Sequence, residues 1–177
     1  MKYIVSDNNL IFEYQKIERK LYDLDNFNPK TTAFPKPLFK KKFDKIVSLK
    51  SNDWFHSELD FNNLVAFVKS IGSDTFIASC SPYNLIAPIE VPVSASLEEY
   101  VDSHSYKSVE GHQFQGVGIR KSLETFYYDK SAKWAIVSDL TNDITIVGLE
   151  KNIVKDFKKA FEGRFTAIQL LSKKLSK

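Results

Sequence analysis

The sequence predicts an α+β fold: a single domain in which a mainly antiparallel sheet is covered by helices, including a long C-terminal helix. Two observations lead to this fold class. Short β-rich runs separated by turn residues lie in the C-terminal half, and runs with apolar residues every three or four positions lie before and after them. Short strands joined by tight turns favour antiparallel pairing, and a small meander needs a covering helix in water. A chain of 177 residues fits one domain, here residues 1–177.

The first helix is expected over residues 7–25, with Asp7 or Ser6 as its N-cap. Its apolar side chains recur at steps of three and four and so share one stripe: Leu10, Tyr14, Ile17, Leu21 and Leu24. A strand hairpin that turns at Asp7-Asn8 is the alternative, because apolar residues also alternate in this segment. Residues 26–42 contain three prolines and are expected to be irregular, because proline is excluded from helix interiors and central strands.

Two further helices are expected in the middle of the chain. Residues 61–71 have the pattern of a helix with one buried face, ended by Gly72. Residues 97–101 predict a short helix capped by Ser94 or Ser96. Short strands or extended segments are expected around these helices at 46–49, 75–79 and 85–93.

The clearest pattern is a β-meander in the C-terminal half. Residues 125–128, 134–138 and 144–148 are rich in aromatic and β-branched side chains, and short polar turns join them. This spacing predicts three consecutive antiparallel strands.

A long C-terminal helix is expected after the meander. Its apolar stripe would consist of Ile153, Phe157, Phe161, Phe165, Ile168, Leu171 and Leu175. Gly163 either splits this helix or weakens it. We expect Trp134 to be buried against it, near Phe157 or Phe161.

Composition excludes several classes of function. The single cysteine, Cys80, rules out an intramolecular disulfide and a cysteine-rich zinc site. Only three of the 25 basic residues are arginines and the net charge is +3, so a nucleic-acid partner is not expected. No secretory segment and no apolar run of roughly 20 residues is seen, so we expect a cytoplasmic protein without membrane contact.

No motif indicates catalysis, a cofactor or a metal. Gly116 is followed by Val117, whereas a phosphate-binding loop needs a lysine there. His104 and His112 are eight positions apart without the spacing of a metal site on a helix or strand. We therefore expect no catalytic residue, no metal site and no cofactor, and an inert thiol at Cys80.

One acidic segment is the candidate partner-binding site. Residues 90–110 hold five acidic residues against Lys107, a net charge of −4, whereas residues 151–177 have a net charge of +6. Such polarity steers a charged partner. The candidate residues are Glu98, Glu99, Asp102 and Glu110. A basic face at Lys40-Lys41-Lys42 is the competing site.

The run 126–139, FYYDKSAKWAIVSD, continued by ITIVG at 144–148, resembles a family pattern. It is similar to the C-terminal portion of many small bacterial proteins, including immunity proteins of contact-dependent-inhibition and other polymorphic toxin systems. The resemblance implies a cytosolic antitoxin-like protein that neutralises a cognate toxin by occluding it. It transfers no functional residues.

Two other classes of function stay open. One is an enzyme with a dispersed active site, which a deep pocket with perturbed titratable groups would favour. The other is a phage or mobile-element accessory protein that binds nucleic acid or a host factor through residues 36–45. A continuous lysine-lined groove would favour that alternative.

Overall fold

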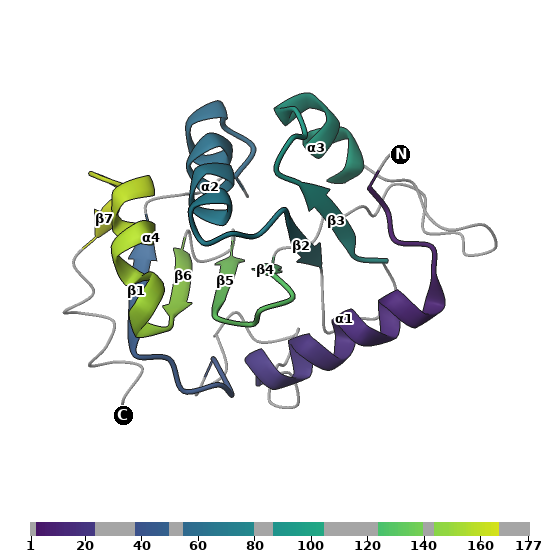
Figure 1. The fold of residues 1–177 in the computed structure, drawn as a ribbon, viewed down its shortest axis with the longest axis horizontal. Coiled ribbons are helices and arrows are strands. Elements are labelled where there is room, and N and C mark those ends of the chain that lie inside the picture. Colours follow the sequence, from purple (N-terminus) through teal and green to yellow (C-terminus); the bar gives the residue numbers. More distant parts are fainter. Residues whose placement is uncertain are drawn as a thin grey trace.

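The fold is a seven-stranded antiparallel sheet with helices on both faces (Figure 1). The structure is a computed structural model and describes residues 3–23, 38–49, 55–79, 87–104, 124–139 and 144–166. The elements are α1 (Asn8–Leu21), β1 (Lys45–Leu49), α2 (Glu58–Ser70), β2 (Thr75–Ser79), β3 (Ile89–Pro92), α3 (Leu97–His104), β4 (Glu124–Tyr128), β5 (Trp134–Asp139), β6 (Ile144–Leu149), the 3₁₀ helix η3 (Lys151–Ile153), α4 (Val154–Ala160) and β7 (Phe165–Thr166). The α+β class is confirmed.

Capping interactions mark the start of α1 and both ends of α2. The Asp7 carboxylate accepts a hydrogen bond of 2.8 Å from the Asn9 N–H, so α1 is a capped helix and the alternative hairpin is wrong. The Ser57 hydroxyl accepts from the Asp60 N–H at the start of α2. At its end, Gly72 has φ of +78°, and the Gly72 and Ser73 N–H groups bond to carbonyls of the last turn.

The strand order is β3-β2-β4-β5-β6-β1-β7. The three strands expected as a meander, β4, β5 and β6, pair in sequence, with Tyr127 opposite Ile136 and Ile136 opposite Val147. The N-terminal segment pairs with the outer side of β3 through a bridge between Ile4 and Ile89. Backbone N–H groups that would lie open at this edge are therefore partly used.

The sheet separates two hydrophobic cores. In Figure 1, α1 lies on one side of the strands and α2 and α3 lie on the other. The first core contains buried residues of α2, α3 and α4, and the second contains residues of α1 and of the segment 38–43. Alternate residues of β2, β4, β5 and β6 contribute to the two cores, as the pleat requires, whereas β1 and β3 contribute to the first core only.

Trp134 is completely buried, as expected. Its indole lies edge-on to Phe67 of α2, with ring centroids 5.5 Å apart, and Phe67 packs edge-on against Phe157 of α4 at 5.0 Å. The indole therefore belongs to the core, but it lies against α2, and Phe67 stands between it and Phe157 of the C-terminal helix.

The long C-terminal helix is wrong. The helical segment after β6 consists of three residues of η3 and seven of α4, and it ends at Ala160. Gly163 follows with φ of +76°, and the chain then enters β7, where Phe165 lies opposite Leu49. The step from Phe161 to Phe165 continues the helical period, but the left-handed glycine lets Phe165 pair with β1 instead. Ile153, Phe157 and Phe161 are buried, and the stripe residues beyond 166 lie outside the described residues.

Candidate functional site

A groove of about 430 Å³ lies between the N-terminal segment, the start of α1 and the sheet edge formed by β2 and β3. Its walls are partly apolar and include two carboxylates, those of Asp7 and Glu90. The lining residues are Tyr3, Ile4, Val5, Ser6, Asp7, Leu10, Thr75, Glu90 and Pro92. Apolar walls with a few placed polar groups are typical of binding sites.

Glu90 faces this groove because of the strand pleat. Its neighbours Ile89 and Val91 are buried in the core under α2 and α3, so Glu90 lies on the opposite face of β3, towards α1. There its Oε2 accepts a hydrogen bond from the Tyr14 hydroxyl. Its Oε1 accepts from the Thr75 hydroxyl at 3.2 Å and lies 2.9 Å from the Lys130 Nζ. These four residues, Glu90, Tyr14, Thr75 and Lys130, form the Glu90 network.

The network determines which of its members are charged. Burial alone would raise the pKa of Glu90, but the hydrogen bonds from Tyr14 and Lys130 outweigh it and leave that pKa below its usual value. Burial, followed by the hydrogen bond to Glu90, raises the pKa of Tyr14 to about 12. At neutral pH the site therefore holds an ionised carboxylate and a neutral phenol.

Helix α3 begins beside the groove with a capping box. The Glu99 N–H donates to the Ser96 hydroxyl, and the Ser96 N–H donates to Glu99 Oε2, both at 3.1 Å. The same Oε2 accepts a hydrogen bond of 2.8 Å from the hydroxyl of Tyr3, which lines the groove. Tyr3 therefore connects the groove to α3.

The predicted site residues have different roles in the structure. Glu98 and Asp102 are exposed, and their separation of four positions places them on one face of α3. Glu99 is partly buried because it belongs to the capping box and to the Tyr3 contact. Glu110 lies outside the described residues. We define the exposed carboxylates of Glu98 and Asp102, together with the adjoining groove, as the acidic end of the molecule.

The competing basic face is partly used inside the fold. Lys41 donates to the carbonyl of Ala132 at 2.6 Å and forms an ion pair with Glu150 at 2.7 Å. Lys40 and Lys42 are exposed. Only two of the three consecutive lysines can therefore meet a partner without breaking a contact between the segment 38–43 and the sheet.

Sequence reasoning also missed the buried carboxylate of Glu18 in α1. It is 3% exposed, and its Oε1 accepts hydrogen bonds from the hydroxyls of Ser79 and Tyr128. Burial raises the pKa values of Tyr128 and of the adjacent Tyr22 well above their usual value. Glu18 follows Tyr14 by four positions and so lies on the apolar stripe of α1. A charged residue on that stripe was the sequence signal for a buried carboxylate. These contacts hold α1 against the sheet.

The other sequence motifs add no further site within the described ranges. No group of three potential metal ligands lies together there, and no helix there is long and apolar enough to cross a membrane. His56 packs edge-on against Tyr100 at 5.5 Å, and His104 is the last residue of α3. Cys80, His112 and Gly116 lie outside the described residues.

Comparisons with protein families, with curated proteins and with solved structures found no match for this chain. The function is therefore inferred from the acidic end itself.

Proposed function

We propose that the protein is a small cytoplasmic binding protein, an immunity protein that neutralises a cognate bacterial toxin by occluding it. The acidic end would be its docking surface. The observation that carries this proposal is the placement of two exposed carboxylates, Glu98 and Asp102, on one face of α3, the helix whose Glu99 contacts Tyr3 in the wall of a groove that contains Glu90. The resemblance of residues 126–148 to immunity proteins supports the same class of function.

The chemistry of the groove favours binding over acid–base catalysis. A general base works best when its pKa lies near the operating pH. The pKa of Glu90 is shifted away from neutrality, and each of its oxygens already accepts hydrogen bonds from the network. The carboxylate therefore stays ionised in its pair with Lys130 and does not act as a proton acceptor, and the exposed negative charge for a partner comes from Glu98 and Asp102.

The partner expected at this surface carries a basic patch. Complementary charge across an interface mainly raises the association rate, and salt screens it over about 8 Å at physiological ionic strength. A toxin that acts on nucleic acid presents such a patch, because it must bind phosphates. Covering that patch would block access to the substrate without any chemistry by this protein.

The test is co-expression with each candidate toxin domain encoded by a neighbouring gene, followed by association kinetics with the purified pair. Glu98→Lys together with Asp102→Lys should slow association, most strongly at low salt, and should reduce protection of growing cells. The matched control is Glu13→Lys with Glu162→Lys, which makes the same charge change at exposed positions on α1 and beyond α4. Unchanged kinetics for the α3 variant at low and high salt would refute the docking surface. Failure of the wild-type protein to bind or protect would refute the function.

A further inference from the structure

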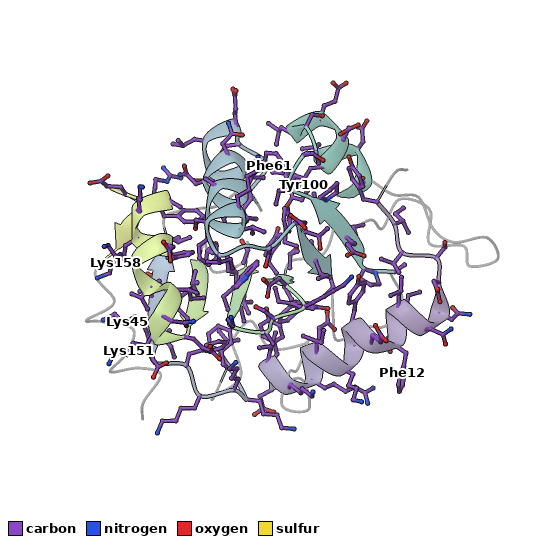
Figure 2. All side chains as sticks on the ribbon, in the orientation of Figure 1. Phe12, Lys45, Phe61, Tyr100, Lys151 and Lys158 are labelled. Carbon is purple, nitrogen blue, oxygen red and sulfur yellow. The ribbon has the colours of Figure 1, made fainter. Side chains whose placement is uncertain are left out.

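A second charged surface lies at the opposite end of the sheet from α3. Five exposed lysines lie on β1, η3 and α4: Lys45, Lys151, Lys155, Lys158 and Lys159. Figure 2 shows Lys45, Lys151 and Lys158 extending from the same side of the molecule, and Figure 1 places α4 and α3 at opposite ends. We call these five residues the basic edge.

The backbone brings the lysines of different elements together. Lys45 lies opposite Leu149 in the ladder between β1 and β6, and Lys151 follows Leu149 by two residues. The Lys151 N–H donates to Asp44 Oδ2 at 2.8 Å, which confirms that the start of η3 lies beside the start of β1.

The helical lysines continue this row. Lys155 and Lys159 are four residues apart and share a face of the helix, and Lys158 lies beside them. Four residues advance an α-helix by about 6 Å, so the charges form a row along α4. Its spacing is comparable to the distance between neighbouring phosphates of one nucleic-acid strand.

The lysines of the basic edge are not engaged by carboxylates in the described part of the chain. Among the described residues none of the five forms an ion pair, whereas Lys41, Lys130 and Arg164 each pair with a carboxylate. Like charges four residues apart, as at Lys155 and Lys159, destabilise a helix. Lys158 and Lys159 lie in the last turn of α4, where positive charge favours the helix dipole, so only part of the row has a structural benefit. Three carboxylates lie near the five lysines: Asp44 is exposed and accepts from the Lys151 N–H, Asp156 is half-buried and Glu162 is exposed, so positive charge is in excess on this edge.

We propose that the basic edge binds the phosphate backbone of a nucleic acid without reading its sequence. Lysine is a flexible point charge that suits phosphates, whereas base reading relies on the fork of arginine, which the edge lacks. The scarcity of arginine in the chain argues against sequence readout but leaves phosphate contacts open. This inference does not depend on the proposed function, because the two surfaces lie at opposite ends.

The same edge offers little to a membrane. A surface helix that binds lipid combines lysines with apolar side chains that enter the bilayer. Ile46, the exposed apolar residue of β1, follows Lys45 and lies on the opposite face of that strand. We therefore favour a nucleic acid over an anionic lipid surface.

The test uses the full-length protein and a short fluorescent DNA duplex of mixed sequence, with binding followed by anisotropy at several salt concentrations. We expect the logarithm of affinity to fall linearly with the logarithm of salt concentration, and the slope to decrease by about 0.9 for each phosphate that a variant no longer neutralises. Lys155→Glu with Lys159→Glu should weaken binding by about tenfold or more. A second duplex of different sequence should bind equally well.

The matched control is Lys16→Glu with Lys20→Glu, an exposed pair at the same spacing on α1. It should change affinity much less than the α4 pair. If the circular dichroism spectrum shows that the glutamate variant is unfolded, Lys155→Gln with Lys159→Gln replaces it in the binding measurement, because glutamine removes the positive charges without adding negative ones. An equal loss for the α1 and α4 pairs, sequence-dependent affinity, no binding of the duplex, or binding only to phosphatidylserine vesicles would each overturn the proposal.

Discussion

Tyr14 of α1 donates a hydrogen bond to Glu90 of β3, a contact between residues 76 positions apart in the chain. It joins a helix on one face of the sheet to its edge strand. Lys130, in the turn between β4 and β5, completes the arrangement with its Nζ 5.4 Å from the centre of the Tyr14 ring and 2.9 Å from Glu90. The groove wall is therefore tied to three separate parts of the fold.

Glu90→Gln should destabilise the protein at neutral pH, and the difference from wild type should shrink in acid. The pKa of Glu90 in the folded protein lies below its usual value of 4.5, so the ionised carboxylate contributes stability above that pH. This contribution is lost as the pH falls through the folded-state pKa. Urea unfolding of both proteins between neutral pH and pH values below 4.5 measures the effect.

The control for this prediction is Glu98→Gln, at an exposed carboxylate on α3. Its difference from wild type should be small at every pH. A Glu90→Gln variant whose destabilisation stays constant down to the acid limit would show that the carboxylate charge contributes nothing.

Tyr14→Phe tests the same hydrogen bond from the other side. The pKa of Tyr14 is raised from 10.0 to about 12, so the neutral phenol contributes stability below pH 10, and that contribution is lost as the pH rises towards 12. Wild type should therefore lose stability over this alkaline range more steeply than the phenylalanine variant. Parallel unfolding curves over that range would contradict the assignment.

Trp134→Ala should reduce the free energy of unfolding by about 3–5 kcal/mol, because it leaves a large cavity beneath α2. Trp134→Phe should cost much less. The buried Trp134 Nε1 has no hydrogen-bond partner among the described residues, so phenylalanine also removes an unsatisfied donor. Chemical unfolding of the two variants checks the order; equal losses would mean that cavity volume does not dominate.

Gly148→Ala should destabilise the protein by about 1–3 kcal/mol through overpacking. A Cβ at position 148 would overlap Cδ2 of Phe43 and lie 2.8 Å from its Cγ. The whole ring, including the atom attached to Cβ of Phe43, would therefore have to move. Phe43→Leu should relieve much of the loss in the double variant. A tolerated Gly148→Ala in thermal unfolding would show that Phe43 moves away freely.

Local sequence patterns sufficed for most elements but not for their arrangement. The cap at Asp7, the glycine stop at Gly72 and the meander are encoded within a few residues, and all three are confirmed. The insertion of β1 between β6 and β7 depends on pairing between distant segments, for which no short-range signal exists. For the same reason, the helical spacing of apolar residues wrongly predicted that the C-terminal helix continues through Phe165, which instead pairs with Leu49 of β1.

Only the negative charge of the candidate site could be predicted from the sequence. Counting acidic residues identified the α3 segment, but it did not separate Glu99 from Glu98, although the capping-box spacing from Ser96 to Glu99 was present. Glu90 was counted there as one acidic residue among five. Its role depends on Tyr14 and Lys130, which only the folded chain brings to it.

Glu99→Ala and Glu98→Ala should therefore differ in stability although they remove adjacent, identical side chains. Glu99 caps α3 and accepts from Tyr3, so its loss should cost about 0.5–2 kcal/mol. Glu98 is exposed, so its loss should stay within about 0.5 kcal/mol. Both changes have the same effect on intrinsic helix propensity, which makes each the control for the other. If the proposed docking surface is used, association kinetics should show the reverse order, because Glu98 is exposed and Glu99 is partly buried. Equal stabilities in urea unfolding would contradict the structural role of Glu99 in capping α3.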